Sequence, residues 1–252
     1  MSEMYSESMD PQVIVSMTSW KGRLYNELTG PVIFSFIEQE SPVPFKVVLV
    51  LSSDEFPGRE KDVPKGILTM AKGCEHFEIL WCKENSGPYK KFFPVRRKYP
   101  TLPIITVDDD SPAKPNFMKD MWKLHTKNPD RVIYGCDRKP YPWIGPHSID
   151  CVRFGVGMYP PGALYDLDEK FGMKYFNFMD DEFMRLLCLL NGTHYATVDA
   201  NSLLILQAFA QDRSIGRTHG REFREINGMW GTLGRERPDL KKIWSKNRKL
   251  RN

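Results

Sequence analysis

Runs of apolar residues recur along the first half of the chain, and segments of helical character separate them. Five runs have the length and composition of buried strands: VIVSM (13–17), FKVVLVL (45–51), FEILW (77–81), PIITV (103–107) and RVIYG (131–135). The helical segments lie near 31–40, 62–72, 88–98 and 115–127. Because the strands are continuously apolar and helices intervene, the pattern predicts an α/β fold with a mostly parallel sheet covered by helices on both faces.

The second half of the chain alternates less regularly. It contains a stretch rich in Gly and Pro (139–162), a strong amphipathic helix (181–191) and a short pair of predicted strands (194–206). We find no internal repeat and no low-complexity linker. The sequence therefore predicts one domain over residues 1–234 and a C-terminal tail over 235–252 that we expect to be helical.

Composition is that of an ordinary soluble globular protein, with 41% hydrophobic and 27% charged residues. No apolar run approaches the ~18 residues of a membrane span. The first residues, MSEMYSESMDPQ, are acidic and polar, unlike a signal or transit peptide. Five cysteines at irregular spacings form neither a disulfide framework nor a zinc motif. We therefore expect a cytoplasmic protein.

Positive charge is concentrated in the tail. Residues 235–252 contain eight Lys or Arg and two Asp or Glu, a net charge of +6, and the whole chain carries +4, so the remainder sums to −2. Such a tail suits the anionic inner face of a membrane, and Trp244 and Leu250 among the charges favour a surface-binding helix. A solvated helix end is the alternative. No nucleic-acid partner is expected.

Polar residues follow the predicted strands. Right-handed crossovers bring the carboxyl ends of parallel strands to one edge of the sheet, where ligands of open α/β sheets bind. The segments expected to meet there are 18–23 (TSWKGR), 52–55 (SSDE), 83–86 (KENS) and 108–110 (DDD). Hydroxyls, bases and acids therefore converge on one rim.

Three consecutive acids, Asp108, Asp109 and Asp110, end the strand predicted at 103–107. Residues two apart in an extended segment project to the same side, so Asp108 and Asp110 should share a face while Asp109 points away. Two carboxylates on one face suit Mg²⁺ or Mn²⁺, which keep positions for water and phosphate. The alternative is a turn at 110–112 whose acids are solvated.

Six segments in order resemble a group of bacterial, family-2-like glycosyltransferases with the GT-A fold, commonly associated with capsule, exopolysaccharide or lipopolysaccharide assembly. The segments are IVSMTSWKGR, VVLVLSSDEFP, GPYKKFFPVRRKYP, PIITVDDD, GVGMYPPGAL and FMDDEFMRLLCLLNG. The resemblance implies a single nucleotide-binding domain that uses a divalent cation, Mn²⁺ or Mg²⁺. It further implies a nucleotide-sugar donor, typically a UDP-sugar, and a glycan or lipid-linked glycan acceptor.

By position, Asp108 and Asp110 resemble the DxD motif of these enzymes. The last acid of that motif contacts the metal, and the first usually lies near the ribose or sugar, with Asp109 between them in the nucleotide site. The resemblance places nucleoside contacts in the loop after the first strand, at Thr18, Ser19 and Arg23.

The resemblance also assigns roles to two further pairs. Asp54 and Glu55 follow the second strand, where they would flank the nucleobase. Lys90 and Lys91 match a paired-lysine position near the nucleotide, and a solvated charge pair at a helix start is the alternative reading.

The expected catalytic base lies in NFMDDEFMRLLCLLNG. Asp180 resembles an N-cap, Asp181 and Glu182 fill the first turn, and Gly192 closes the helix. Because the resemblance places an Asp/Glu-Asp base motif here, we assign Asp181 as base and Asp180 as the alternate. Such a base permits one in-line displacement with inversion. The helix dipole stabilises acids at this end even without catalysis.

Two later segments also carry family features. The stretch GVGMYPP (155–161) resembles a glycine-containing loop that approaches the sugar, and a simple turn is the alternative. His219 lies where some GT-A enzymes place a further metal ligand, although a lone histidine is more often structural.

Two other functions stay open. A nucleotidyltransferase also holds Mg²⁺ with acids at strand ends, but it usually begins with a glycine-rich phosphate loop, which TSWKGR is not. A non-catalytic nucleotide-sugar-binding partner would need the first acid cluster but not the second pair, Asp180 and Asp181.

Overall fold

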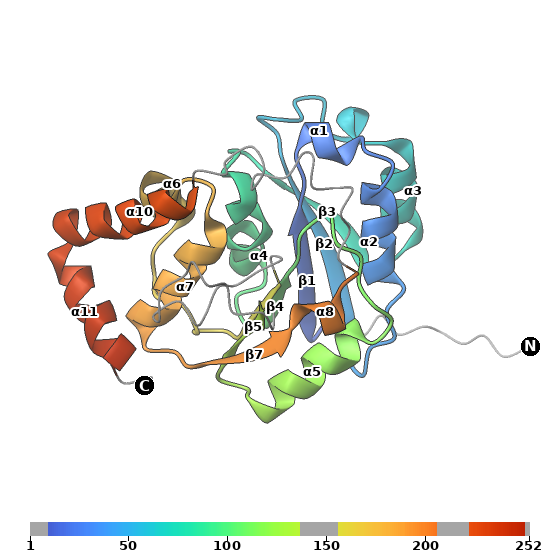
Figure 1. Ribbon diagram of the computed structural model, residues 1–252. Helices are drawn as coiled ribbons and strands as arrows, with labels where there is room; N and C mark the ends of the chain where they lie inside the picture. Colours follow the sequence, from blue (N-terminus) through green and yellow to red (C-terminus); the bar gives the residue numbers. More distant parts are fainter. Residues whose placement is uncertain (1–9, 137–155, 206–221, 250–252) are drawn as a thin grey trace, which may run out of the picture.

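The computed structural model describes residues 10–136, 156–205 and 222–249, which form a seven-stranded sheet with helices on both faces (Figure 1). The strands are β1 (Val13–Thr18), β2 (Phe45–Ser52), β3 (Phe77–Cys82), β4 (Ile104–Thr106), β5 (Val132–Cys136), β6 (Gly157–Tyr159) and β7 (Tyr195–Asp199). Their order in the sheet is β3-β2-β1-β4-β6-β5-β7. Only β6 runs antiparallel to its neighbours, β4 and β5, within this sheet. The predicted α/β class, with a mostly parallel sheet, is confirmed.

The continuously apolar strands are explained by two hydrophobic clusters, one on each face of the sheet. In β1, Val15 and Met17 belong to the first cluster, whereas Ile14 belongs to the second. In β2, Leu49 faces the first cluster and Val50 faces the second. Because successive side chains of a strand point to opposite faces, both faces can be buried only if nearly every residue is apolar.

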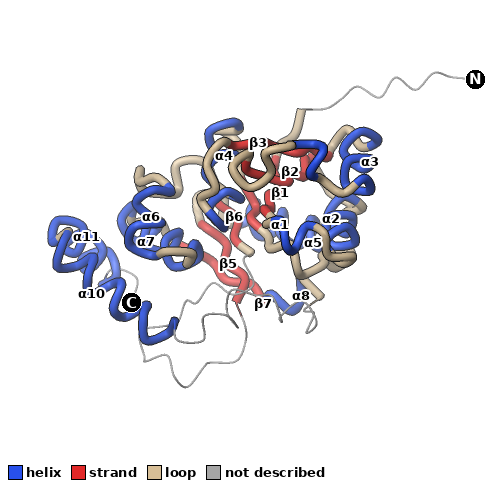
Figure 2. Tube along the Cα trace, turned by 90° about the horizontal axis from the view of Figure 1, so that it is seen from above, coloured by secondary structure: helices blue, strands red, loops and turns tan. Residues whose placement is uncertain are grey.

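Helices contribute to both clusters and lie on opposite sides of the sheet (Figure 2). The first cluster receives side chains from α1 (Lys21–Leu24), α2 (Thr29–Ile37), α3 (Lys65–Gly73), α5 (Phe117–Lys127) and α8 (Ala200–Leu203). The second receives them from α4 (Phe93–Lys98), α6 (Glu169–Phe176), α7 (Asp180–Asn191), α10 (Glu222–Glu236) and α11 (Pro238–Lys249). Two 3₁₀ turns, η1 (Arg59–Asp62) and η2 (Gly87–Lys91), complete the connections.

Two strands were predicted over 194–206, and the prediction of the second strand is wrong. β7 ends at Asp199, and the next residues form the short helix α8. The Asp199 side chain caps this helix by accepting from the backbone N–H of Asn201, and such capping favours a helical turn. Beyond α8, Leu204 makes only an isolated bridge to Ala113.

The helical part of the basic tail is packed onto the domain. Leu240 and Trp244 of α11 are buried, and the Trp244 ring meets Trp230 of α10 edge-on at 5.1 Å between centroids. Asn247 Nδ2 donates to the Leu189 carbonyl oxygen of α7 at 2.7 Å. The expectation that Trp244 faces a membrane is therefore wrong, because its indole fills the second cluster.

Two further points concern the ends of the chain. The expected boundary after residue 234 lies inside α10, and Leu250 lies outside the described residues. Among the helices of the described segments, none has the length and apolarity needed to cross a bilayer.

Candidate active site

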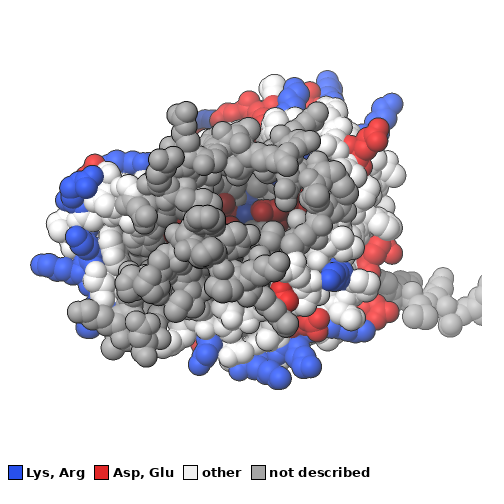
Figure 3. Space-filling view, in the orientation of Figure 1, with Lys and Arg blue, Asp and Glu red and all other residues white. Residues whose placement is uncertain are grey.

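Two acid groups that are distant in the sequence meet at the carboxyl edge of the sheet. Lys91, the last residue of η2, connects them: its Nζ lies 2.8 Å from Asp108 Oδ1 and 2.9 Å from Asp180 Oδ2. Asp108 follows β4, and Asp180 begins α7. Figure 3 shows acidic and basic atoms side by side near the centre of the face that is viewed in Figure 1. The two expected acid pairs therefore belong to one site.

Arg23 of α1 joins the other two acids of the triplet. Its Nη1 lies 2.5 Å from Asp109 Oδ1 and 3.3 Å from Asp110 Oδ2. Asp109 is the most buried of the three, with a side chain 5% exposed, whereas Asp108 is 36% and Asp110 21% exposed. The burial of the three side chains alternates as predicted, with Asp109 the most buried. Asp109 and Asp110 nevertheless share the guanidinium of Arg23, because the backbone turns after β4.

The two carboxylates expected to hold metal differ in their electrostatics. Burial and the nearby Asp108 raise the pKa of Asp110 to about 6, against the opposing effect of Arg23. Burial alone would also raise the pKa of Asp108, but Lys91 and Arg23 lower it below its usual value. Asp108 therefore stays ionised, whereas Asp110 is poised between its two protonation states.

The acids at the start of α7 are the most perturbed. Burial, followed by the charge of Asp180, raises the pKa of Asp181 well above its usual value. Burial also raises the pKa of Asp180, although the ammonium of Lys91 opposes this. Asp108 and Asp180 in turn raise the pKa of Lys91 well above its usual value, despite burial. A buried carboxyl of raised pKa is typical of general bases.

A divalent cation fits the first acid pair in one specific way. In the described part of the chain, no three His, Cys, Asp or Glu side chains form a metal-binding group. Mg²⁺ and Mn²⁺, however, can take one or two carboxylates and complete their coordination with water and substrate phosphates. Asp108 and Asp110 match that donor set, since the repulsion that raises the pKa of Asp110 would be relieved by a cation.

The remaining donor-site residues expected after β1 have structural contacts. Thr18 Oγ1 donates to the Val50 carbonyl oxygen at 2.7 Å, which ties the ends of β1 and β2. Ser19 is buried beside Asp109, where burial raises the pKa of the carboxyl and Arg23 and the Ser19 hydroxyl partly oppose that rise.

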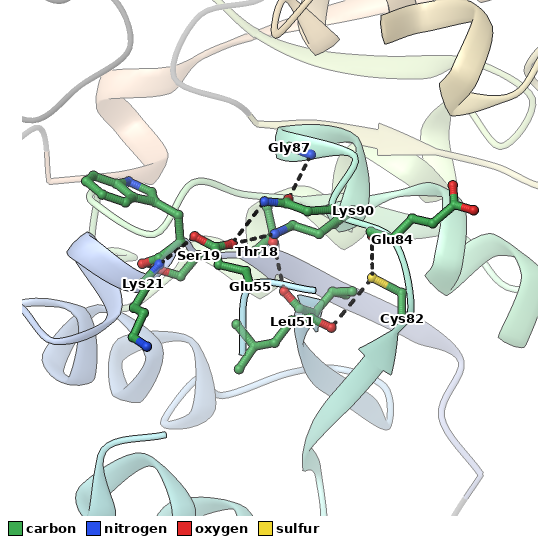
Figure 4. Close-up of polar contacts among 12 residues, drawn as sticks. Thr18, Ser19, Lys21, Leu51, Glu55, Cys82, Glu84, Gly87 and Lys90 are labelled. Atoms are coloured by element: carbon green, nitrogen blue, oxygen red, sulfur yellow. Dashed lines mark hydrogen bonds and ion pairs between the residues drawn. The ribbon is translucent and has the colours of Figure 1, made fainter. Parts of the chain in front are cut away.

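Glu55 and Lys90 form a second ion pair at the same edge (Figure 4). Lys90 Nζ lies 3.3 Å from Glu55 Oε2. Asp54, by contrast, is exposed, and the structure does not bring it into either pair. The alternative reading of Lys90 and Lys91, a solvated charge pair, is wrong, because both are buried.

Two residues of the site region were missed from the sequence. Tyr89 is buried, and its hydroxyl has no hydrogen-bond partner among the described residues. Glu182 is also buried and accepts from Arg185 Nη1 at 3.2 Å and from Trp230 Nε1 at 3.3 Å, which ties α7 to α10. The position of Tyr89 beside Lys90 and Lys91 could have indicated that it lies at the site. No local sequence pattern could have predicted the contact of Glu182 with Trp230.

The other sequence expectations have mixed outcomes. α7 begins at Asp180, with Met179 rather than Asp180 at the N-cap, and Gly192 closes it at φ 72°, as expected. Gly157 is the first residue of β6, which pairs with β4 and β5, so the expected sugar-facing loop is wrong at this residue. A side chain there would meet the Tyr159 hydroxyl. Gly155 and His219 lie outside the described residues.

Comparisons with known proteins reveal a structural likeness only. No protein-family model and no curated protein matches the chain. The solved structures that match include one of S. aureus TarS and one of S. aureus TarS 1-349 in complex with UDP. The first is 14% identical over 77% of this chain and 36% of its own, and the second 15% identical over 77% and 59%, each with a TM-score of 0.50.

The chain therefore spans less than two thirds of either TarS chain. TarS is a GT-A-type glycosyltransferase. At this level of identity the likeness shows a shared fold, and it confirms the predicted GT-A, Rossmann-like class.

Proposed function

We propose that this chain is a metal-dependent glycosyltransferase that transfers a sugar, with inversion, from a UDP-sugar to a hydroxyl of a glycan or lipid-linked glycan. The observation that carries the proposal is the contact of Lys91 with both Asp108 and Asp180. That contact links the pair expected to bind a cation, and through it a diphosphate, to the buried carboxyls of Asp180 and Asp181. A buried carboxyl of this kind is suited to deprotonate an acceptor hydroxyl. The choice of UDP is supported by the UDP complex of the TarS neighbour.

In the donor half of the proposed site, positively charged groups would lie around the leaving diphosphate. Asp108 and Asp110 would hold the divalent cation, which when bound would neutralise charge on the diphosphate. Arg23, Lys90 and Lys91 add positive charge on the protein side. Preorganised charge of this kind is often the largest single contribution to catalysis.

In the acceptor half, Asp181 is the proposed base. Asp180 is engaged by Lys91, whereas Asp181 has no hydrogen-bond or ion-pair partner among the described residues. The raised pKa of Asp181 makes its ionised form a stronger base for the acceptor hydroxyl. Proton removal on the side opposite the leaving group would give inversion in one step.

The donor assignment is tested by thermal shift with UDP, GDP, CDP and ADP, each with and without Mn²⁺. A ligand that binds only the folded state raises its melting temperature in proportion to RT ln(1 + [L]/Kd). We expect a shift for UDP that requires Mn²⁺ and disappears in Asp110→Ala. The absence of a shift with every nucleotide would remove the donor site from the proposal.

The catalytic assignment is tested by Asp181→Asn. This variant should bind UDP as the wild type does and should transfer no sugar from the UDP-sugar identified by screening. Undiminished turnover would exclude Asp181 as the base and turn attention to Asp180. Binding without turnover in the wild type, for every acceptor, would favour a non-catalytic nucleotide-sugar-binding protein.

The tail supplies a further part of the proposal. On α11, Lys241, Lys242 and Lys246 are exposed, whereas Leu240 and Trp244 are buried against the domain. An outward basic face suits the anionic inner surface of a cell membrane, which would bring a lipid-linked acceptor to the site. Flotation with phosphatidylserine vesicles at low salt should carry the wild type, and a Gln variant of these three lysines should remain unbound.

A further inference from the structure

Lys90 is a buried ammonium group with little compensation. It is 2% exposed, on η2, and its ion-pair partner in the described structure is Glu55, at 3.3 Å between Nζ and Oε2. An ammonium has three protons to donate. Removing such a group from water is unfavourable unless an anion lies beside it.

Glu55 is held in place by two other segments (Figure 4). Its Oε1 accepts from the backbone N–H of Lys21, at the start of α1, at 2.9 Å. Its Oε2 accepts from Asn85 Nδ2, in the loop after β3, at 3.3 Å. The carboxylate thus connects three loops of the carboxyl edge, and both of its oxygens are engaged by the protein. That arrangement differs from the free nucleobase contact expected from the sequence.

We propose that Glu55 is a positioning residue for donor binding, the resident counter-ion that holds Lys90 until the diphosphate of the donor replaces it. This inference rests on the proposed function, in which Lys90 faces the diphosphate. Glu55 then has two opposite effects. It stabilises the free protein by pairing a buried ammonium, and it weakens donor binding because the diphosphate must compete with its charge.

The variant Glu55→Gln separates these effects. The Gln side chain can still accept from Lys21 N–H, but it has no charge for Lys90. We expect the melting temperature of the free protein to fall by about 5 °C, since a buried cation loses its anion. We expect the Kd for UDP with Mn²⁺ to tighten by about fivefold, because the diphosphate no longer has to displace a resident carboxylate from Lys90. Inorganic pyrophosphate should show the same change.

Glu60→Gln is the matched control, with the same chemical change on the exposed face of η1. It should leave both the melting temperature and the Kd within error of the wild type. Lys90→Met supplies the second control. In that background, Glu55→Gln should no longer tighten UDP binding.

The outcomes separate the two levels of the proposal. A wild type that binds UDP, with a Glu55→Gln variant that binds it equally or more weakly, overturns the counter-ion role of Glu55 alone. Tightening that persists in Lys90→Met also overturns it. If the wild type binds neither UDP nor pyrophosphate, the proposed function is overturned, and the proposed role of Glu55 is overturned with it.

Discussion

Replacing Asp110 by Asn should stabilise the metal-free protein at neutral pH and abolish cation-dependent donor binding. The Asp110 carboxylate is 21% exposed, contacts Arg23 at 3.3 Å and lies near Asp108. Burial and that like charge raise its pKa from 3.8 to about 6. The folded protein therefore holds the proton of Asp110 more tightly than the unfolded chain does.

The sign and size of the effect follow from linkage. When the folded-state pKa is raised, the stabilising contribution is fully present below the unfolded value, near pH 4, and is lost as pH rises through about 6. At pH 7 the ionised carboxylate therefore destabilises the fold by about 3 kcal/mol relative to a neutral side chain. For a chain of this size, that corresponds to a melting temperature roughly 6 to 10 °C higher in Asp110→Asn.

The assay is thermal unfolding in a chelating buffer between pH 4.5 and 8. The advantage of Asp110→Asn should grow as pH rises and level off above pH 7, while Asp166→Asn, at an exposed position, should follow the wild type throughout. With Mn²⁺ and UDP the order should reverse, since only the wild type gains from the ligand. A variant that is less stable than the wild type at pH 7, or equally changed at every pH, would refute the electrostatic argument.

Three further substitutions test the packing and charge of the site. Lys91→Met should lower the free energy of unfolding, measured with urea, by about 3 kcal/mol, because two carboxylates lose a shared buried cation; an unchanged midpoint would contradict this. Tyr89→Phe should raise it by about 1 kcal/mol, since the hydroxyl is buried with no partner in the part of the chain that the structure describes, and a loss of stability would reveal a bond that the hydroxyl makes. Gly172→Ala should lower it by about 1 to 3 kcal/mol, because a Cβ there would lie 2.6 Å from Phe183 Cδ1 and 2.9 Å from Tyr89 Cε1, which calorimetry would check.

The strands that build the parallel core were predictable because burial on both faces leaves a strong sequence signal. Val47 and Val48 of β2, for example, belong to opposite clusters, so the run is apolar at every position from Val47 to Leu51. β6 has no such signal. It is three residues long, antiparallel, and inserted between β4 and β5 by pairing that is set by the rest of the sheet. A local reading of its glycine predicts a loop.

The site was predictable as a set of residues, but not as a set of contacts. The topology rule for parallel strands placed Arg23 and Asp108 at one edge, and the resemblance pointed to Lys91 and Asp181. Nothing local to the sequence specifies that Lys91 contacts Asp180, since that contact depends on how α7 packs over η2. The same holds for Glu55, whose three partners come from two different connections, Lys21 from the one after β1 and Asn85 and Lys90 from the one after β3.

The charge balance of the cluster favours a ligand over a purely structural role. Among the described residues, two cations, Arg23 and Lys91, lie beside five carboxylates, Asp108, Asp109, Asp110, Asp180 and Asp181, of which the last has no ion-pair partner there. The pKa values of the last four are all raised, so the folded protein keeps these acids at the expense of stability. A cluster that served only to hold loops together would be more stable with neutral side chains at several of these positions. A bound divalent cation would offset the excess negative charge, and the fold would then recover the stability that it lacks in the free state.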